Sequence, residues 1–117
     1  SRLAGKSKAM QLMAEGNLIE FEQALELGIV NYVWPAEDNG RKWWDRVMEY
    51  AWSFCPPNKA AKAVGSMKRA VQTGWEIPIE AGLAVERELQ QQLFLSEDAK
   101  EGLAAYNEKR KPEFKGR

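Results

Sequence analysis

The sequence predicts an all-α chain of about six short helices with one extended connector. Apolar residues recur at spacings of three and four positions through most of the 117 residues, which is the pattern of amphipathic helices. Glycine and proline interrupt this pattern repeatedly, as they do at helix ends and turns. No region is rich enough in strands to make a sheet of its own. We therefore expect one all-α domain over residues 1–117.

Residues 1–35 are expected to form a first helical pair and an extended exit. Apolar residues at helical spacing over 9–13 stop at Gly16, and a second short run over 24–27 stops at Gly28. Glycine is favoured just past a helix end because it adopts the left-handed conformation without strain. The following residues are apolar and partly β-branched up to a proline, so we expect an extended stretch there.

Residues 39–117 are expected to form the remaining helical array and a basic tail. A helix over 39–54 carries an i, i+3, i+4 apolar stripe, and we assign its Trp44 and Trp52 to the core. Trp43 points away from that stripe by about 100°. It is either a subunit contact or a partly exposed surface residue.

The next two helices follow a pair of prolines. Asn58 is the expected N-cap of the first of them, and Gly74 its expected end. Pro78 suits an early position in the second. The first has a narrow stripe of mostly small residues that lets a neighbouring helix approach closely. The stripe consists of Ala60, Ala63, Val64, Met67, Ala70 and Val71.

The last helix is expected to begin after Ser96, whose hydroxyl caps helix N-termini well. Glu97 and Asp98 follow in its first turn, and the favourable interaction with the helix dipole is sufficient to explain both. The helix is expected to end near 109–111, where basic side chains favour the negative end of the dipole. Pro112 prevents its continuation.

The composition excludes several classes of function. Lys plus Arg and Asp plus Glu both number 17, so no net positive charge attracts nucleic acid. Histidine is absent, which removes nucleophile arrangements with histidine and imidazole metal sites. No apolar run approaches the roughly 20 residues of a membrane span. The single cysteine, Cys55, is expected to be buried and inert, and it fits a reducing, cytoplasmic compartment.

Two clusters of charge have simple interpretations. Glu80, Glu86 and Glu88 are candidates for an acid–base pair, but glutamates on an exposed helix face are usually solvated. The tail carries five positive charges in nine residues, at Lys109, Arg110, Lys111, Lys115 and Arg117. As a pattern alone, these charges indicate a solvated tail, although they also suit a phosphate ligand.

Two stretches resemble the enoyl-CoA hydratase/isomerase (crotonase) family. The first starts with Arg2-Leu3-Ala4-Gly5-Lys6 and leads through two helices to Gly28-Ile29-Val30-Asn31 and Val33-Trp34-Pro35. The second, more specific stretch runs from Ser96-Glu97-Asp98-Ala99-Lys100-Glu101-Gly102 through Ala105-Tyr106 to Glu108-Lys109-Arg110-Lys111-Pro112-Glu113-Phe114-Lys115-Gly116. The resemblance covers essentially the whole chain. Three features depart from it: Glu20 replaces a capping Ser or Asp, Phe21 replaces a small residue, and residues 36–44 contain an additional Trp pair.

The resemblance implies that the catalytic part of such a protein lies outside these residues. In the family, an N-terminal spiral domain binds CoA and supplies the catalytic carboxylates and the oxyanion-hole amides. We therefore expect no catalytic residue, no metal and no tightly bound cofactor in this chain, and no activity from it alone. The substrate of the parent protein would be a coenzyme A thioester.

The resemblance also assigns roles that these residues can perform. The family's C-terminal helices pack subunits into trimers, often paired into hexamers, so a homo-oligomer is expected. An aromatic residue and a lysine on the last helix approach the CoA of a neighbouring subunit. Those positions match Tyr106 and Lys109, which are the expected CoA-binding residues. Acyl-CoA is thus the expected ligand, and neither nucleic acid nor a membrane is an expected partner.

Two functions stay open at this point. The chain is either a segment of an enzyme that hydrates or isomerises a 2-enoyl-CoA through an enolate, or a free-standing helical module that oligomerises without catalysis. A proteolytic fragment and a truncated gene product both fit the first. Other reactions of the family, including hydrolysis, decarboxylation and ring formation, fit the sequence as well.

Overall fold

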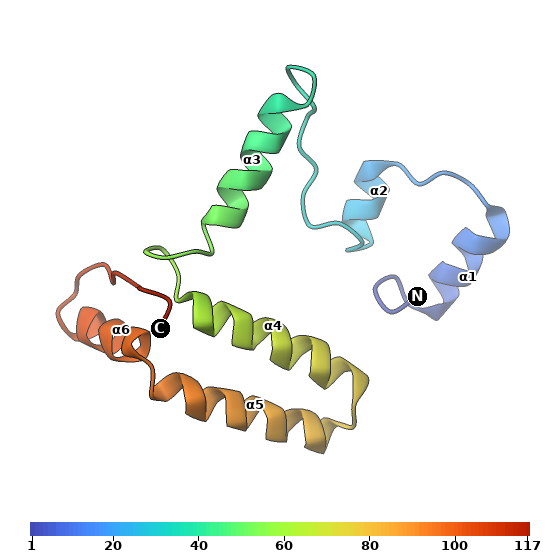
Figure 1. Ribbon diagram of the computed structural model, residues 1–117. Coiled ribbons are helices and arrows are strands. Elements are labelled where there is room, and N and C mark those ends of the chain that lie inside the picture. The colour runs from blue at the N-terminus through green and yellow to red at the C-terminus, as the bar shows by residue number, and fades with distance from the viewer. The chain divides into compact units, whose positions relative to one another are not determined.

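The computed structural model describes residues 1–117 and confirms the all-α class, with six helices and no strand (Figure 1). The helices are α1 (Lys6–Glu15), α2 (Phe21–Glu26), α3 (Arg41–Trp52), α4 (Ala61–Glu76), α5 (Ile79–Phe94) and α6 (Glu97–Asn107). The stretch between α2 and α3 contains no regular element, and its extended conformation stays a prediction. The chain divides into two compact units, Ser1–Trp44 and Asp45–Arg117.

The first unit relies on local helix endings. Gly16 has a φ of 63° and its N–H donates to the carbonyl of Leu12 at 3.1 Å, so it ends α1 in the predicted left-handed conformation. Gly28, with a φ of 68°, has the same role after α2. Glu20 precedes α2 and makes no capping hydrogen bond through its side chain. Ala9 is the one buried residue of this unit.

The second unit is organised around α5, which packs against α4 and against α6 (Figure 1). Gly74 of α4 and Gly82 of α5 mark the closest approach of the first pair, because a Cβ added to Gly82 would lie 3.3 Å from the Cα of Gly74. The prediction that Gly74 ends its helix is therefore wrong. The helix continues to Glu76, and the missing side chain serves close packing instead.

Two other predicted helix boundaries need correction. The helix predicted over 39–54 is α3, which is two residues shorter at each end. Asp38 and Asn39 have φ values of 55° and 53°, which a right-handed helix does not allow. Asn58 is not an N-cap, because α4 begins three residues later, at Ala61, and Asn58 lies in a turn in which its N–H donates to the carbonyl of Cys55 at 3.0 Å. The N-cap of α4 is Ala60, which makes no capping bond.

The core is smaller than the apolar pattern predicted. The buried apolar residues are Ala9, Leu89 and Ala105. Trp44 and Trp52 are 55% and 64% exposed, so their assignment to the core is wrong, and Trp43 at 39% is less exposed than either. Within the second unit, α3 packs against no other helix, which leaves its apolar face uncovered. Cys55 is half-buried rather than buried. None of the six helices is long and apolar enough to cross a membrane.

Candidate functional site

The beginning of α6 is fixed as the sequence predicted. The Ser96 hydroxyl accepts a hydrogen bond from the backbone N–H of Ala99 at 3.1 Å, and donates to the carbonyl of Leu93 at 2.6 Å. Ser96 is 7% exposed, so both bonds are shielded from water. This cap joins the end of α5 to the start of α6 and fixes the direction in which α6 leaves the hairpin.

The end of α6 is closed by a Schellman motif. Arg110 N–H donates to the carbonyl of Ala105 at 3.0 Å, and Lys109 N–H donates to the carbonyl of Tyr106 at 3.2 Å. Lys109 occupies the left-handed position between them, with a φ of 54°. The helix ends at Asn107, two residues before the predicted basic end, because the chain reverses at Lys109.

The two predicted CoA-binding residues, Tyr106 and Lys109, lie together at this helix end. Their main chains are joined by the hydrogen bond of the motif, and both side chains are exposed, Tyr106 at 81%. Neither the phenol nor the ammonium group makes a hydrogen bond or ion pair within the chain. An aromatic ring and a free cation are therefore available to a ligand that has both a planar group and negative charge.

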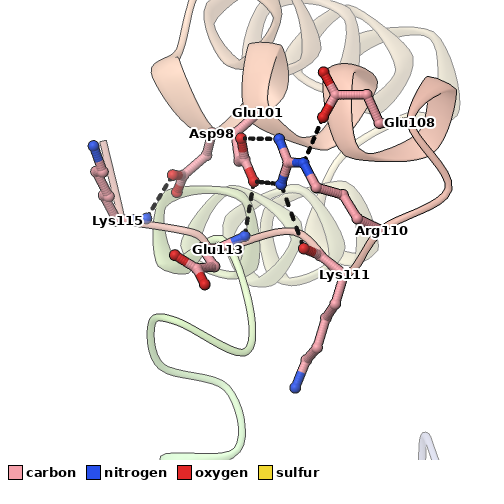
Figure 2. Close-up of polar contacts among 7 residues, drawn as sticks. All are labelled: Asp98, Glu101, Glu108, Arg110, Lys111, Glu113 and Lys115. Atoms are coloured by element: carbon pink, nitrogen blue, oxygen red, sulfur yellow. Dashed lines mark hydrogen bonds and ion pairs between the residues drawn. The ribbon is translucent and has the colours of Figure 1, made fainter.

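Arg110, which the sequence analysis treated as surface charge, makes ion pairs with two glutamates, Glu101 and Glu108. Its Nη1 and Nη2 donate to the two carboxylate oxygens of Glu101 at 2.6 and 3.0 Å, and its Nε donates to Glu108 at 2.6 Å (Figure 2). These bonds to Glu101 and Glu108 raise the pKa of Arg110 above its usual range. The bond from Arg110, together with the bond from the N–H of Glu113, lowers the pKa of Glu101 to about 2.

Asp98 has a second role that the sequence analysis missed. Its two carboxylate oxygens accept hydrogen bonds from the N–H groups of Lys115 and Gly116 at 2.7 and 2.8 Å, and its own N–H donates to the carbonyl of Arg117 at 2.9 Å. It is 3% exposed. The helix dipole alone is therefore not a sufficient explanation of Asp98, because the residue also anchors the tail to α6.

Residues 111–117 thus form a strap across α6. Glu113 N–H donates to Glu101 at 2.9 Å, next to the Arg110 fork (Figure 2). Phe114 lies over Gly102, where a Cβ would meet its ring at 3.6 Å, and its N–H donates to the carbonyl of Pro57 at 3.2 Å. The strap therefore ties α6 to the turn that precedes α4.

The sequence contained a signal for the strap. Asp98 and Glu101 are three residues apart, which puts them on one face of a helix. Gly102 follows on the same helix, and a bare surface there leaves room for an aromatic ring from elsewhere. The remaining cations of the tail, Lys109, Lys111 and Lys115, make no ion pair through their ammonium groups, and Figure 2 shows the Lys111 side chain leading away from the fork.

Residues 1–117 match the family described as Enoyl-CoA hydratase/isomerase. The chain is 36% identical to the 2,3-dehydroadipyl-CoA hydratase of Escherichia coli K12, over 99% of this chain and 43% of that protein. It is 33% identical to the mouse mitochondrial enoyl-CoA hydratase domain-containing protein 2, over 99% of this chain and 38% of that protein.

Solved structures give the same result. A crystal structure of an enoyl-CoA hydratase from Geobacillus kaustophilus HTA426 superposes with a TM-score of 0.86 at 42% identity, over 99% of this chain and 42% of that one. Enoyl-CoA hydratase from Bacillus anthracis gives a TM-score of 0.82 at 29% identity, over 99% and 43%. The chain spans less than half the length of the relatives that it matches. Residues 1–117 therefore belong to the enoyl-CoA hydratase/isomerase family.

Proposed function

We propose that this chain is the C-terminal helical segment of an enzyme that hydrates or isomerises a 2-enoyl-CoA thioester through an enolate. In that protein the segment packs subunits together and supplies part of the wall of the CoA pocket. Catalytic carboxylates and oxyanion-hole donors would come from residues outside this stretch. The names of the relatives support a CoA thioester as the substrate class, since those compared above are hydratases of such compounds by description.

One observation supports the contact with CoA. A main-chain hydrogen bond joins Tyr106 and Lys109 at the end of α6, and neither side chain is bound within the chain. CoA presents an adenine ring and several phosphate oxygens. An exposed phenol ring offers that adenine a stacking surface. The ammonium group offers the phosphates a point charge with three donors. Arg110 offers neither, because Glu101 and Glu108 already occupy its guanidinium group.

The exposed apolar face of the α4–α5 hairpin supports the packing of subunits. Val71, Trp75 and Ile79 are each about two-thirds exposed, at 70%, 66% and 67%. Soluble monomers rarely expose contiguous apolar surface of this kind, and such patches usually mark an interface. A homo-oligomer, as a trimer or a dimer of trimers, is the assembly that we propose for the parent protein.

The same exposed face favours the second candidate, a free-standing helical module that oligomerises without catalysis. The two candidates differ at Tyr106 and Lys109. An enzyme segment recognises CoA there, whereas an interaction module has no need of an anionic ligand. Binding of CoA by this chain would therefore favour the enzyme segment, whereas self-association fits both candidates.

The test uses the 117-residue chain with its intact mass verified. We expect no hydration of crotonyl-CoA above buffer, followed as loss of thioester-conjugated absorbance. In a ¹⁵N NMR titration with CoA, we expect amide shifts around 106–110, and none with pantetheine, which lacks the phosphates. Lys109→Gln should weaken CoA binding about threefold, the size of an exposed charge interaction. Lys42→Gln, which removes another exposed lysine, should leave it unchanged.

Each outcome has a clear meaning. Turnover of crotonyl-CoA would show that these helices contain the chemistry, and the assignment to a non-catalytic segment would be wrong. Equal binding of CoA by the wild type and by the Lys109→Gln variant would remove Lys109 from the site. Absence of any CoA-dependent shift would show that Tyr106 and Lys109 do not bind CoA in this chain by themselves.

A further inference from the structure

Lys109 adopts a backbone conformation that its residue type disfavours. Its φ of 54° lies in the left-handed region, and the equivalent position after a helix is usually glycine because a Cβ is strained there. Such strain persists only where the surroundings hold the residue in place. Neighbouring residues must therefore hold Lys109 in this conformation, and a functional side chain would explain why glycine does not occupy the position.

The residue that follows Lys109 is anchored through both its main chain and its side chain. Arg110 N–H is bound to the carbonyl of Ala105, while its guanidinium group spans both oxygens of Glu101. The Arg110–Glu101 contact is a bidentate fork, which fixes orientation as well as position. Glu101 is in turn held by the N–H of Glu113 in the strap, at 2.9 Å. Motion of Arg110 away from α6 would break the fork and release the chain at Lys109.

We propose that Glu101 is a positioning residue for the recognition of CoA phosphates by Lys109. This inference rests on the proposed function. Glu101 does two things: it fixes the main chain beyond Lys109, and it occupies Arg110, so that the ammonium group of Lys109 is the cation offered beside Tyr106. Asp98 assists by binding the far end of the strap through Lys115 and Gly116.

The sign of one substitution distinguishes this role from simple electrostatics. Glu101→Gln removes a negative charge near the site and frees Arg110. If only net charge mattered, the variant would bind the anionic CoA more tightly. If Glu101 positions Lys109, the variant binds CoA more weakly although the site has become more positive. Glutamine keeps a carbonyl oxygen for the N–H of Glu113, so the substitution is nearly isosteric.

The experiment is a CoA titration followed by ¹⁵N NMR on four variants and the wild type. We expect Glu101→Gln to weaken binding about twofold and Lys109→Gln about threefold. The double variant should be no weaker than Lys109→Gln alone, because Glu101 acts through Lys109. Glu97→Gln is the matched control: it removes the same charge from the same helix and breaks an exposed pair with Arg117, and its affinity should equal or slightly exceed that of the wild type.

A fifth variant tests the strain directly. Lys109→Gly relieves the left-handed conformation, so we expect its Tm to rise by about 3 °C while CoA binding falls as far as in Lys109→Gln. A gain of stability with a loss of binding would show that the lysine is held at this position for its side chain. A fall in Tm would overturn the premise that Lys109 is strained.

The outcomes separate the inference from the proposed function. Unchanged or tighter CoA binding by Glu101→Gln, with weaker binding by Lys109→Gln, overturns the positioning role and leaves the CoA contact standing. Additive losses in the double variant also overturn it, because Glu101 would then act independently of Lys109. Absence of CoA-dependent shifts in the wild type overturns the recognition of CoA by Tyr106 and Lys109 in this chain, and this inference with it.

Discussion

In the unit of residues 45–117, α5 packs against both α4 and α6, whereas α1 and α2 of residues 1–44 make no such contact. The second unit contains Leu89, Ser96, Asp98 and Ala105 as buried residues, and the first contains Ala9. The second unit also has the strap, in which side chains bind main-chain groups up to 18 residues away. The first unit has local main-chain hydrogen bonds at the helix ends, made by Gly16 and Gly28.

This difference in packing predicts that the two units differ in tertiary stability although their helical patterns are similar. Both units have helices with clear ends, but tertiary packing of an apolar face, rather than helix ends, supplies most of the stability of helices in proteins. We therefore expect slow amide hydrogen exchange in α5 and α6 and fast exchange in α1 and α2. Four sets of substitutions, ordered from the largest expected effect to the smallest, test this comparison.

The largest effect is expected from Leu89→Ala. Leu89 is 5% exposed in α5, and its removal leaves a cavity that should lower the free energy of unfolding by about 3 kcal/mol. The matched variant Leu12→Ala in α1 removes a half-buried leucine and should lower it by about 1 kcal/mol. Urea unfolding followed by circular dichroism, with NMR hydrogen exchange to assign each unit, measures both. Equal losses would remove the distinction between the units.

Asp98→Asn should lower the free energy of unfolding of the second unit by about 2 kcal/mol. The amide group that replaces one carboxylate oxygen cannot accept from a backbone N–H, so a buried bond to the strap is lost along with the charge. Glu97→Gln, in the same helical turn but exposed, should change stability by less than about 0.5 kcal/mol. Thermal unfolding compares the two variants. A small effect at Asp98 would show that the strap contributes little to the second unit.

Gly82→Ala and Gly65→Ala should have opposite signs. The added methyl group at Gly82 would lie 3.3 Å from the backbone of Gly74, so α4 and α5 have to separate, and we expect a loss of about 1 kcal/mol. Nothing lies within 4 Å of the corresponding position at Gly65, so alanine should add about 0.5–1 kcal/mol through helix propensity. Stabilisation by both variants would mean that the helix pair adjusts its separation freely.

The smallest effect is the acid dependence of Glu101. Folding lowers its pKa from 4.5 to about 2, chiefly through the hydrogen bond from Arg110. The contribution of the fork is therefore complete above pH 4.5 and is lost as the pH falls through about 2. The difference in Tm between the wild type and Glu101→Gln should be present at pH 6 and vanish near pH 2. A difference that persists at pH 2 would assign the stability to another group.

The features predicted correctly from the sequence are those set by neighbouring residues. The Ser96 cap and the turns at Gly16 and Gly28 depend on a few adjacent positions, and the structure has each of them. The exposure of Trp44 and Trp52 depends on whether another element covers α3, which periodicity does not report. Gly74 was misassigned because a glycine near a helix end suits both termination and close packing.

The candidate site is predictable from the sequence only in part. The family resemblance predicts Tyr106 and Lys109, and the structure brings them together at the end of α6. Their role stays a prediction. The partners of Asp98 and Glu101 were missed because they lie 9 to 18 residues further along the chain. A left-handed lysine was also not foreseen, since residue type alone favours glycine there.

The strap also imposes an order of events during synthesis. The two amides that bind Asp98 follow it by 17 and 18 residues. At about 5–20 residues per second, a ribosome adds them about one to four seconds after Asp98 itself. Helices form in about a microsecond, so local helix formation is far faster than the addition of these residues. The last section of the second unit to be translated is thus also the one that completes it.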